Sequence, residues 1–359
     1  MKKETVVVTG ASAGLGRAIA REFGKRKANV ALIARGQAGL EAAAKDIERS
    51  GGAALPLIAD VSDSNAVEAA AAAAERAFGP INIWINNAMV SVFSPVKYMK
   101  PEEFKRVTDV TYLGVVNGTL AALKHMLPRD RGKIVQIGSA LAYRSIPLQS
   151  AYCAAKHAIV GFTDSLRCEL IHDQSRVSIS IVHMPALNTP QFGWVKSRLR
   201  NKAQPVPPIF EPEVGAKAVY WAAHHDRAEI YVGAPTVEAI VGNKIAPRLL
   251  DKYLGRTGYR SQQTSEPEDP ERRDNLWLPG DAHQDHGSRG SFDHDAHPFS
   301  FEAWADLHRS WIALGLGISG LATTLLLTAS RNGHARDGRS RQNGDSQSGS
   351  PAHRTVPVP

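Results

Sequence analysis

Three residues in the middle of the chain have the types and spacing needed to move a proton to or from a carbonyl oxygen. Tyr152 and Lys156 are four residues apart in Tyr-Cys-Ala-Ala-Lys, which places both on one face of a helix, and Ser139 follows an apolar run. A phenol is poorly acidic at neutral pH, but a nearby ammonium favours the phenolate. Tyr152 could therefore act as acid and base beside Lys156, while Ser139 polarises the substrate oxygen. The Tyr-x-x-x-Lys spacing alone is nearly uninformative, so the interpretation depends on what surrounds it.

A glycine-rich segment, Thr9-Gly10-Ala11-Ser12-Ala13-Gly14-Leu15-Gly16, directly follows the first apolar run. Glycines there allow the backbone to turn tightly and to approach a pyrophosphate, which would rest on the positive N-terminal end of the next helix. Such a motif indicates dinucleotide binding only where it connects a strand to a helix, and this segment lies between an expected strand and an expected helix. We therefore assign cofactor contacts to Gly10, Ser12, Gly14, Leu15 and Gly16.

The end of the second apolar run indicates which nucleotide binds. NAD-binding chains commonly end this strand with an acidic residue that binds the ribose 2′-hydroxyl. Here the run ends Leu32-Ile33-Ala34-Arg35, and no acid occurs between Asn29 and Gln37. Arg35 supplies a planar cation that suits a phosphate. The sequence therefore predicts NADP(H).

These residues need a scaffold that brings the ends of several strands together. Residues 1–255 alternate short continuous apolar runs with longer helical segments. This alternation predicts right-handed crossovers and an α/β fold with a doubly wound parallel sheet, a Rossmann fold, in a single catalytic domain. The expected strands are Thr5–Thr9, Asn29–Ala34, Ala54–Ala59, Ile81–Asn86, Lys133–Gly138, Ser178–Met184 and Ile230–Val232, and the expected helices are Arg17–Arg26, Gly39–Ser50, Asn65–Phe78, Pro101–Met126, Ala151–Asp173 and Glu213–His224.

Two further pairs of residues follow expected strands, at the sheet edge where open α/β sheets bind ligands. Asp60 and Val61 follow the third strand, where a carboxylate could accept a hydrogen bond from the adenine amino group. Asn87 and Ala88 follow the fourth strand and would lie along the cofactor.

With the glycine motif, the strand-terminal Ser139 and the Tyr152–Lys156 pair in place, residues 1–240 strongly resemble the short-chain dehydrogenase/reductase family. The resemblance implies that Ser139, Tyr152 and Lys156 are catalytic and that Tyr152 and Lys156 also contact the cofactor. It implies that Pro185 and Thr189 hold the nicotinamide end. The implied enzyme acts on CH-OH groups with NADP as acceptor, interconverting a carbonyl and an alcohol by hydride transfer. The resemblance also implies a homo-oligomer, formed through the long helices Pro101–Met126 and Ala151–Asp173.

Three positions depart from the family pattern. Thr111 replaces the family's fourth catalytic residue, an Asn, and its hydroxyl cannot offer an amide's donor and acceptor geometry. Met89 and Ala186 replace glycines. Because Thr111 makes a proton relay from Lys156 less certain, a second hypothesis stands beside the enzyme, namely a membrane-tethered NADP(H)-binding regulator with little turnover.

The residues after 255 change in character. Residues 256–310 are polar and predict a flexible linker, in which His283, His286, His294 and His297 match no closed metal-site pattern, so no metal is assigned. Trp311–Ala329 has no charged residue and, at about 1.5 Å of rise per residue, just covers a hydrocarbon core of about 30 Å. We expect a transmembrane helix there, with a buried or interfacial helix as the alternative. Residues 330–359 predict a disordered basic tail.

Composition narrows the partners and the compartment. The chain has 359 residues, a formal net charge of +8 and two cysteines, so no disulfide framework is expected and a cytoplasmic catalytic domain fits. No recognition motif supports nucleic-acid binding. The expected partner is a fairly apolar carbonyl or alcohol, which the segment 190–208 would enclose. If residues 311–329 form an anchor, the chain also associates with a membrane.

Overall fold

The structure is a computed structural model that describes residues 3–308. The candidate transmembrane helix 311–329 and the tail 330–359 lie outside this range. Among residues 3–308, no helix has both the length and the apolar character required to cross a bilayer. A single compact unit extends to Leu307.

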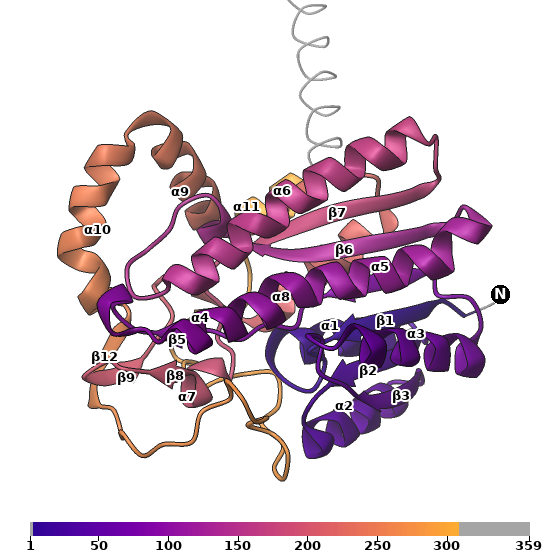
Figure 1. Ribbon diagram of the computed structural model, residues 1–359, viewed down its shortest axis with the longest axis horizontal. Coiled ribbons are helices and arrows are strands. Elements are labelled where there is room, and N and C mark those ends of the chain that lie inside the picture. Colours follow the sequence, from indigo (N-terminus) through magenta and orange to yellow (C-terminus); the bar gives the residue numbers. More distant parts are fainter. Residues whose placement is uncertain (1–2, 309–359) are drawn as a thin grey trace, which may run out of the picture. The chain divides into compact units, whose positions relative to one another are not determined.

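A seven-stranded parallel sheet forms the centre of this unit, in the order β11-β7-β6-β4-β1-β2-β3 (Figure 1). The chain builds outward from β1 in one direction and then from β4 in the other, so a crevice opens at the carboxyl ends of β1 and β4. The predicted doubly wound sheet is confirmed. Its strands are β1 (Thr5–Thr9), β2 (Asn29–Ala34), β3 (Ala53–Ile58), β4 (Ile83–Asn86), β6 (Gly132–Ser139), β7 (Val177–Met184) and β11 (Glu229–Tyr231).

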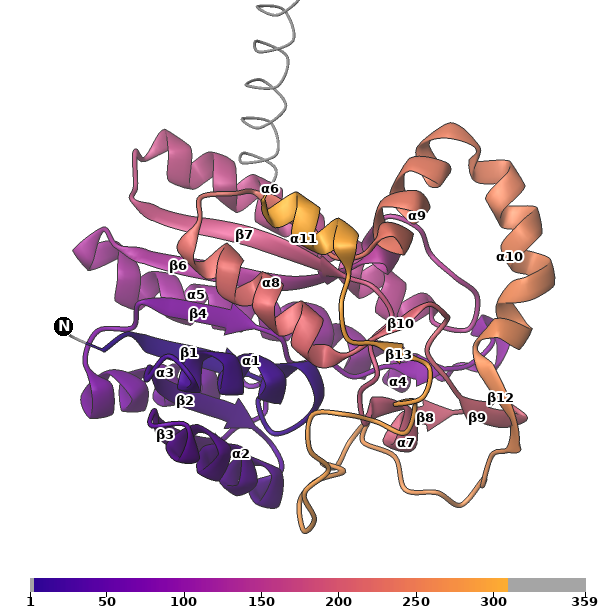
Figure 2. The same ribbon diagram turned by 180° about the vertical axis from the view of Figure 1, so that it is seen from behind.

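Helices cover both faces of the sheet, as Figures 1 and 2 show from opposite sides. Val6 and Val8 belong to the core cluster on one face, whereas Val7 belongs to the cluster on the other, and all three are fully buried. Burial on both faces explains why the strands are continuous apolar runs. One face carries α1 (Gly14–Gly24), α2 (Gln37–Arg49) and α8 (Pro212–His224), and the other carries α3 (Ser64–Phe78), α5 (Gly114–Met126) and α6 (Ser150–His172).

The helix expected over Pro101–Met126 is interrupted. It forms α4 (Pro101–Thr108), a π-helical turn at Asp109–Leu113, and α5. Thr111 lies in this turn and is fully buried. Single π-helical turns inside helices often occur at functional sites, and this one lies beside the crevice.

The expected domain boundary at residue 255 and the separate linker over 256–310 are corrected by the structure. The helices α9 (Ala234–Ile245) and α10 (Pro247–Ser261) lead into β12 (Gln263–Pro267), which pairs with β9 (Asn201–Ala203). Farther on, β13 (Ala296–His297) pairs with β10 (Ile209–Phe210), and α11 (Phe301–Leu307) packs on α8 and β11. Isolated apolar residues hold this polar stretch to the fold, since Leu276 is fully buried and Ala303 nearly so.

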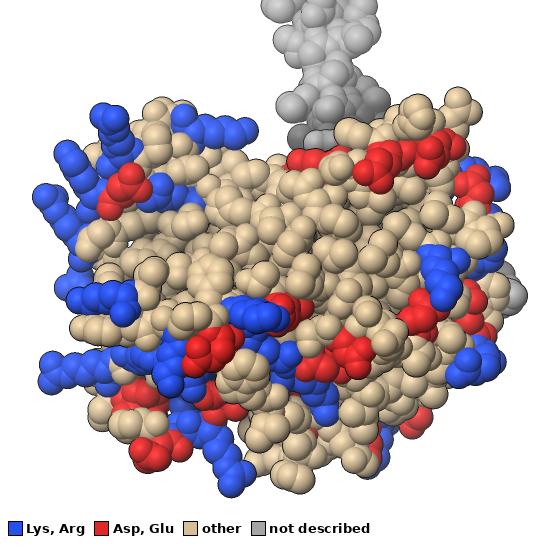
Figure 3. Space-filling view, in the orientation of Figure 1, with Lys and Arg blue, Asp and Glu red and all other residues tan. Residues whose placement is uncertain are grey.

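Basic side chains are not confined to the C-terminal tail. In Figure 3, Lys and Arg gather on the left side of the molecule, where α9 and α10 lie in Figure 1. These two helices contribute Lys244, Arg248, Lys252, Arg256 and Arg260. Part of the positive charge therefore belongs to the folded unit.

Candidate active site

A pocket of about 400 Å³ lies at the carboxyl ends of the central strands. It brings Ser139, Tyr152 and Lys156 together with the glycine-rich segment, although these parts are far apart in the sequence. Every residue predicted to bind the cofactor lines it. Besides Tyr152 and Lys156, these are Gly10, Ser12, Gly14, Leu15, Gly16, Arg35, Asp60, Val61, Asn87, Ala88, Pro185 and Thr189.

The glycine-rich segment forms a cradle that has no room for side chains. Gly10 has a φ of +64°, and a Cβ built on it would lie 2.7 Å from the Cα of Ala88. A Cβ on Gly16 would overlap the carbonyl oxygen of Gly10. The Asn87 amide donates to the carbonyl oxygens of Thr9 at 3.0 Å and Gly10 at 3.2 Å, which ties the segment to the end of β4. This close-approach backbone at a helix N-terminus fits a dinucleotide.

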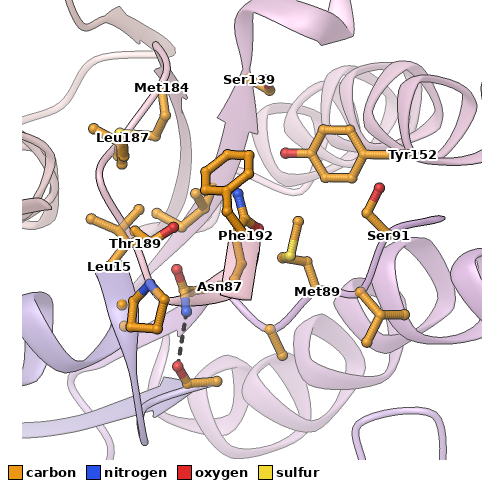
Figure 4. Close-up of a pocket in the computed structure, with 18 of the residues that line it drawn as sticks. Leu15, Asn87, Met89, Ser91, Ser139, Tyr152, Met184, Leu187, Thr189 and Phe192 are labelled. Atoms are coloured by element: carbon orange, nitrogen blue, oxygen red, sulfur yellow. Dashed lines mark hydrogen bonds between the residues drawn. The ribbon is translucent and has the colours of Figure 1, made fainter. Parts of the chain in front are cut away.

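Ser139 and Tyr152 occupy the reacting end of the pocket. Ser139 is the last residue of β6, and its Oγ accepts a hydrogen bond from the Leu141 N–H at 3.1 Å. Tyr152, near the start of α6, lines the same end of the pocket. Figure 4 shows its hydroxyl pointing into the pocket, with Phe192 opposite and Met89 nearby. A carbonyl oxygen placed there would meet two hydroxyl groups.

Lys156 lies one turn farther along α6 and is 3% exposed. Its Nζ donates to the carbonyl oxygen of Ile137 at 2.6 Å and lies 5.5 Å from the centre of the Tyr152 ring. This geometry fixes the amine beside the phenol. The four-residue spacing predicted this placement.

Burial controls the protonation of both groups. It raises the pKa of the Tyr152 phenol above its ordinary value, although the nearby Ser139 hydroxyl opposes this. Burial also lowers the pKa of Lys156 to about 7. Loss of water thus outweighs the expected stabilisation of the phenolate by the ammonium. Tyr152 is therefore a protonated phenol at neutral pH, the state that donates a proton to a carbonyl oxygen.

Thr111 is not among the residues that line the pocket. Its hydroxyl donates to the carbonyl oxygen of Val90 at 2.9 Å and accepts from the Val90 N–H at 3.1 Å. Both bonds hold the backbone between Met89 and Ser91, which do line the pocket. The structure therefore places Thr111 behind the pocket wall, apart from the other three predicted catalytic residues.

A half-buried polar cluster behind Ser139 was missed from the sequence. Glu229 Oε2 accepts hydrogen bonds from the hydroxyls of Tyr143 at 2.6 Å and Tyr231 at 2.7 Å, and it lies 3.1 Å from His183 Nε2. The other ring nitrogen of His183 lies 3.3 Å from the Ser139 carbonyl oxygen. Pairing of β11 with β7 places Tyr231 opposite His183, which only the sheet order could have revealed.

Glu229 gives stability a predictable dependence on pH. Hydrogen bonding to His183 lowers its pKa from 4.5 to about 2, against the opposing effect of burial, and both tyrosine hydroxyls add to the lowering. A carboxyl with a depressed folded-state pKa stabilises the fold fully above pH 4.5 and loses this contribution as pH falls toward 2. Between pH 6 and pH 3, wild type should lose about 2 kcal/mol more unfolding free energy than Glu229→Gln.

Urea unfolding of both proteins at pH 6 and pH 3 measures this difference. Glu271→Gln, at an exposed residue, serves as the matched control and should behave as wild type. Equal losses in wild type and Glu229→Gln would contradict the role given to this carboxyl.

The segment 190–208, which was expected to enclose the substrate, contributes to the pocket wall and also packs onto the fold. Phe192 and Trp194, in α7 (Gln191–Trp194), line the pocket. Val195 instead packs with Phe93 in a small separate cluster, against which Leu199 is also packed. The segment is attached by the short pairing of β8 (Lys196–Ser197) with β5 (Val92–Phe93). One part of it shapes the pocket while another part holds it to the fold.

A C-terminal strap, which we define as residues 272–290, closes the outer side of the pocket and was also missed. Asn275, Pro279, Gly280 and Asp281 line the cavity. The Arg35 guanidinium donates to the carbonyl oxygens of Asn275 at 2.6 Å and Trp277 at 3.1 Å. The sequence signal that could have predicted the attachment of this strap to the fold is the apolar run Leu276–Leu278, which lies within a polar stretch.

Comparisons with known proteins agree with this geometry. The family model described as short chain dehydrogenase matches residues 4–198. An uncharacterized oxidoreductase, YxnA, from Bacillus subtilis (strain 168) is 32% identical over 80% of this chain and 82% of its own length. A 3beta-hydroxysteroid dehydrogenase 1 from Eggerthella lenta is 35% identical over 65% of this chain and 91% of its own. A crystal structure of a metagenomic short-chain oxidoreductase in complex with NADP is similar, with a TM-score of 0.54 and 30% identity, covering 64% of this chain and 97% of that one.

Proposed function

The chain belongs to the short-chain dehydrogenase/reductase family and is an oxidoreductase that depends on a nicotinamide cofactor, and from this premise we propose that it interconverts a carbonyl and an alcohol on a fairly apolar small molecule with NADP(H). The observation that carries the proposal is the convergence of Ser139, Tyr152 and Lys156 in the pocket that the glycine cradle also lines.

The proposed chemistry assigns one task to each side chain. When bound, the cofactor supplies the hydride for reduction and accepts it in oxidation. Tyr152, protonated at neutral pH, gives its hydroxyl proton to the carbonyl oxygen and takes it back in the reverse direction. Ser139 donates a hydrogen bond to the same oxygen and holds it near the phenol. Lys156 lies beside the phenol and would also bind the nicotinamide ribose.

Support for an apolar substrate comes from the pocket wall. Met89, Val90, Phe93, Phe192 and Trp194 all line the cavity. Because burial of apolar surface drives binding of such ligands, a ketone or aldehyde with a hydrophobic body fits better than a charged metabolite. The named activity of the Eggerthella lenta relative, a hydroxysteroid dehydrogenase, agrees with this preference.

The choice of NADP(H) is supported by Arg35 and by the absence of an acid at the end of β2. A 2′-phosphate beside the guanidinium would form charge-assisted hydrogen bonds that a 2′-hydroxyl cannot match. In Arg35→Ala, the ratio of kcat/KM with NADPH to that with NADH should fall at least about 10-fold. Steady-state rates with both cofactors measure this ratio. A ratio that stays at the wild-type value would refute the NADP(H) assignment.

Turnover itself separates the enzyme from the alternative of a regulator. We expect purified full-length protein to oxidise NADPH when offered at least one member of a panel of ketones, aldehydes and acyl substrates. Tight NADPH binding by calorimetry, without turnover on any member of the panel, would favour a cofactor-binding regulator instead.

We further propose a homo-oligomer and a reducing compartment for the catalytic part. Large apolar side chains are exposed on the helices of one sheet face, among them Leu113, Leu120 and Ile171, and an interface would cover them. Cys153 and Cys168 are both free, as expected in a cytoplasmic protein. Sedimentation velocity of the purified protein tests the oligomer, and a purely monomeric species would contradict it.

A further inference from the structure

We infer that Asp281 is a specificity-determining residue, whose carboxylate competes with the 2′-phosphate of NADP(H) for the pocket beside Arg35. The inference deepens the proposed function and rests on its cofactor assignment. Asp281 belongs to the C-terminal strap, 246 positions after Arg35 (281 − 35), so only the fold brings these opposite charges together.

The Asp281 side chain fills a second space, at the start of α2, which we call the α2 cradle. The residue is 5% exposed, and a Cβ built on Gly36 or on Gly39 would overlap its carboxylate. Its carbonyl oxygen accepts a hydrogen bond from the Gly39 N–H at 3.2 Å, and the Ala282 carbonyl oxygen accepts one from the Ala38 N–H at 3.4 Å. Glycines at positions 36 and 39 thus leave a space at the helix N-terminus that an anionic group occupies.

The surroundings of this cradle suit an anion. The N-terminal end of a helix carries partial positive charge, and the first turn of α2 contains no acidic residue of its own. The cation of Arg35 interacts electrostatically with Asp281. Even so, Asp281 Oδ2 is buried without a hydrogen-bond partner. A buried carboxylate oxygen left unpaired is costly unless its surroundings are built for negative charge.

The α2 cradle coincides with the expected position of the 2′-phosphate. Arg35 directly follows β2, and Ser12 from the glycine-rich segment lies close to Gly39 and lines the same pocket. A 2′-phosphate placed there would meet the Asp281 carboxylate in the same space and with the same sign of charge. The 2′-hydroxyl of NAD(H) brings no charge and can donate a hydrogen bond to the free Oδ2. Asp281 should therefore weaken NADP(H) binding more than NAD(H) binding.

Contacts on both sides of Asp281 hold the strap in place. Leu276 is fully buried, and its carbonyl oxygen accepts a hydrogen bond from Arg106 Nε at 3.1 Å. On the other side, the Gly287 carbonyl oxygen accepts from the Gly14 N–H at 3.0 Å, and Asp285 pairs with Arg17. Because these anchors do not involve the Asp281 side chain, Asp281→Asn should remove the charge and leave the strap attached.

Direct binding to the full-length protein tests the inference without turnover. Adenosine 2′,5′-bisphosphate carries the 2′-phosphate, and adenosine 5′-monophosphate lacks it. By calorimetry, Asp281→Asn should bind the bisphosphate at least about 10-fold more tightly than wild type does, with the monophosphate changed less than about 2-fold. Glu271→Gln removes an exposed carboxylate just before the strap and should change neither ligand. In rates, the NADPH/NADH ratio of kcat/KM should rise in Asp281→Asn.

Two results would overturn the inference. Unchanged bisphosphate affinity in Asp281→Asn would show that the carboxylate does not compete. Equal changes for both nucleotides would show that Asp281 only attaches the strap. Thermal unfolding of Asp281→Asn and of a second variant, Asp281→Ser, identifies any general loss of structure. Both variants are expected to bind the bisphosphate more tightly, without a matching gain for the monophosphate. Failure of the NADP(H) assignment is recognised separately, by an unchanged cofactor ratio in Arg35→Ala.

Discussion

Replacing Tyr152 with phenylalanine is expected to lower kcat for carbonyl reduction by roughly 10²–10⁴-fold. The substitution removes the hydroxyl that points into the pocket (Figure 4), while it keeps the ring on α6. Without this hydroxyl, the forming alkoxide loses its assigned proton donor. Cofactor affinity should change much less, because the glycine cradle and Arg35 are untouched. Steady-state kinetics and calorimetry with NADPH measure the two quantities.

Tyr220→Phe is the matched control for this variant. Tyr220 lies on α8 and packs against Phe23, with ring centres 5.1 Å apart, and it is not among the residues that line the pocket. Its loss of a hydroxyl should leave kcat within about 3-fold of wild type. Comparable rates in Tyr152→Phe and Tyr220→Phe would show that the phenol is not the proton donor.

Replacing Lys156 with methionine should have the second-largest effect, a fall in kcat of roughly 10²–10³-fold. Methionine has a similar length but cannot donate to the Ile137 carbonyl oxygen, which Lys156 contacts at 2.6 Å. The charge beside the phenol is lost with it. If the amine also holds the nicotinamide ribose, KM for NADPH should rise in the same variant.

Lys133→Met separates catalysis from the removal of a buried amine. Lys133, at the other end of β6, is 7% exposed, and burial lowers its pKa to about 8. It does not line the pocket. We expect Lys133→Met to keep wild-type kcat, so equal losses in the two methionine variants would indicate a general effect of repacking the core.

Most of the sheet could be predicted because its signals are local. The runs at 5–9 and 29–34 are strands with the expected bounds, since burial on both faces makes each of them a continuous apolar run. The helix over 101–126 was predicted as continuous, whereas it contains a π-helical turn at Asp109–Leu113, from which Thr111 contacts Val90. A contact of that kind leaves no periodic pattern.

The candidate site was predictable where motifs mark it and not where distant segments supply it. Tyr152 and Lys156 share one helix, and the glycines of the glycine-rich segment by themselves predict the turn that this segment forms. Glu229 and Asp281 have no local signature, since each acquires its role from a partner far away in sequence. Residues 256–310 were expected to form a linker, because the polar composition of this stretch hides the few buried side chains that attach residues 256–307 to the fold. Low hydrophobicity predicts weak packing on average and says little about single anchoring residues.

The reduction of a carbonyl in this pocket, with the phenol of Tyr152 as the proton donor, is the reaction that we propose for this protein. Its most direct test is the mass of the alcohol formed from an accepted ketone or aldehyde, with NADPH carrying deuterium at the transferable position of nicotinamide C4. We predict an alcohol that contains one deuterium on the carbinol carbon with wild type, and roughly 100-fold less of it with Tyr152→Phe in the same time. Equal amounts of labelled alcohol from both proteins would show that the phenol is not the proton donor, and an alcohol without deuterium would exclude hydride transfer from NADPH.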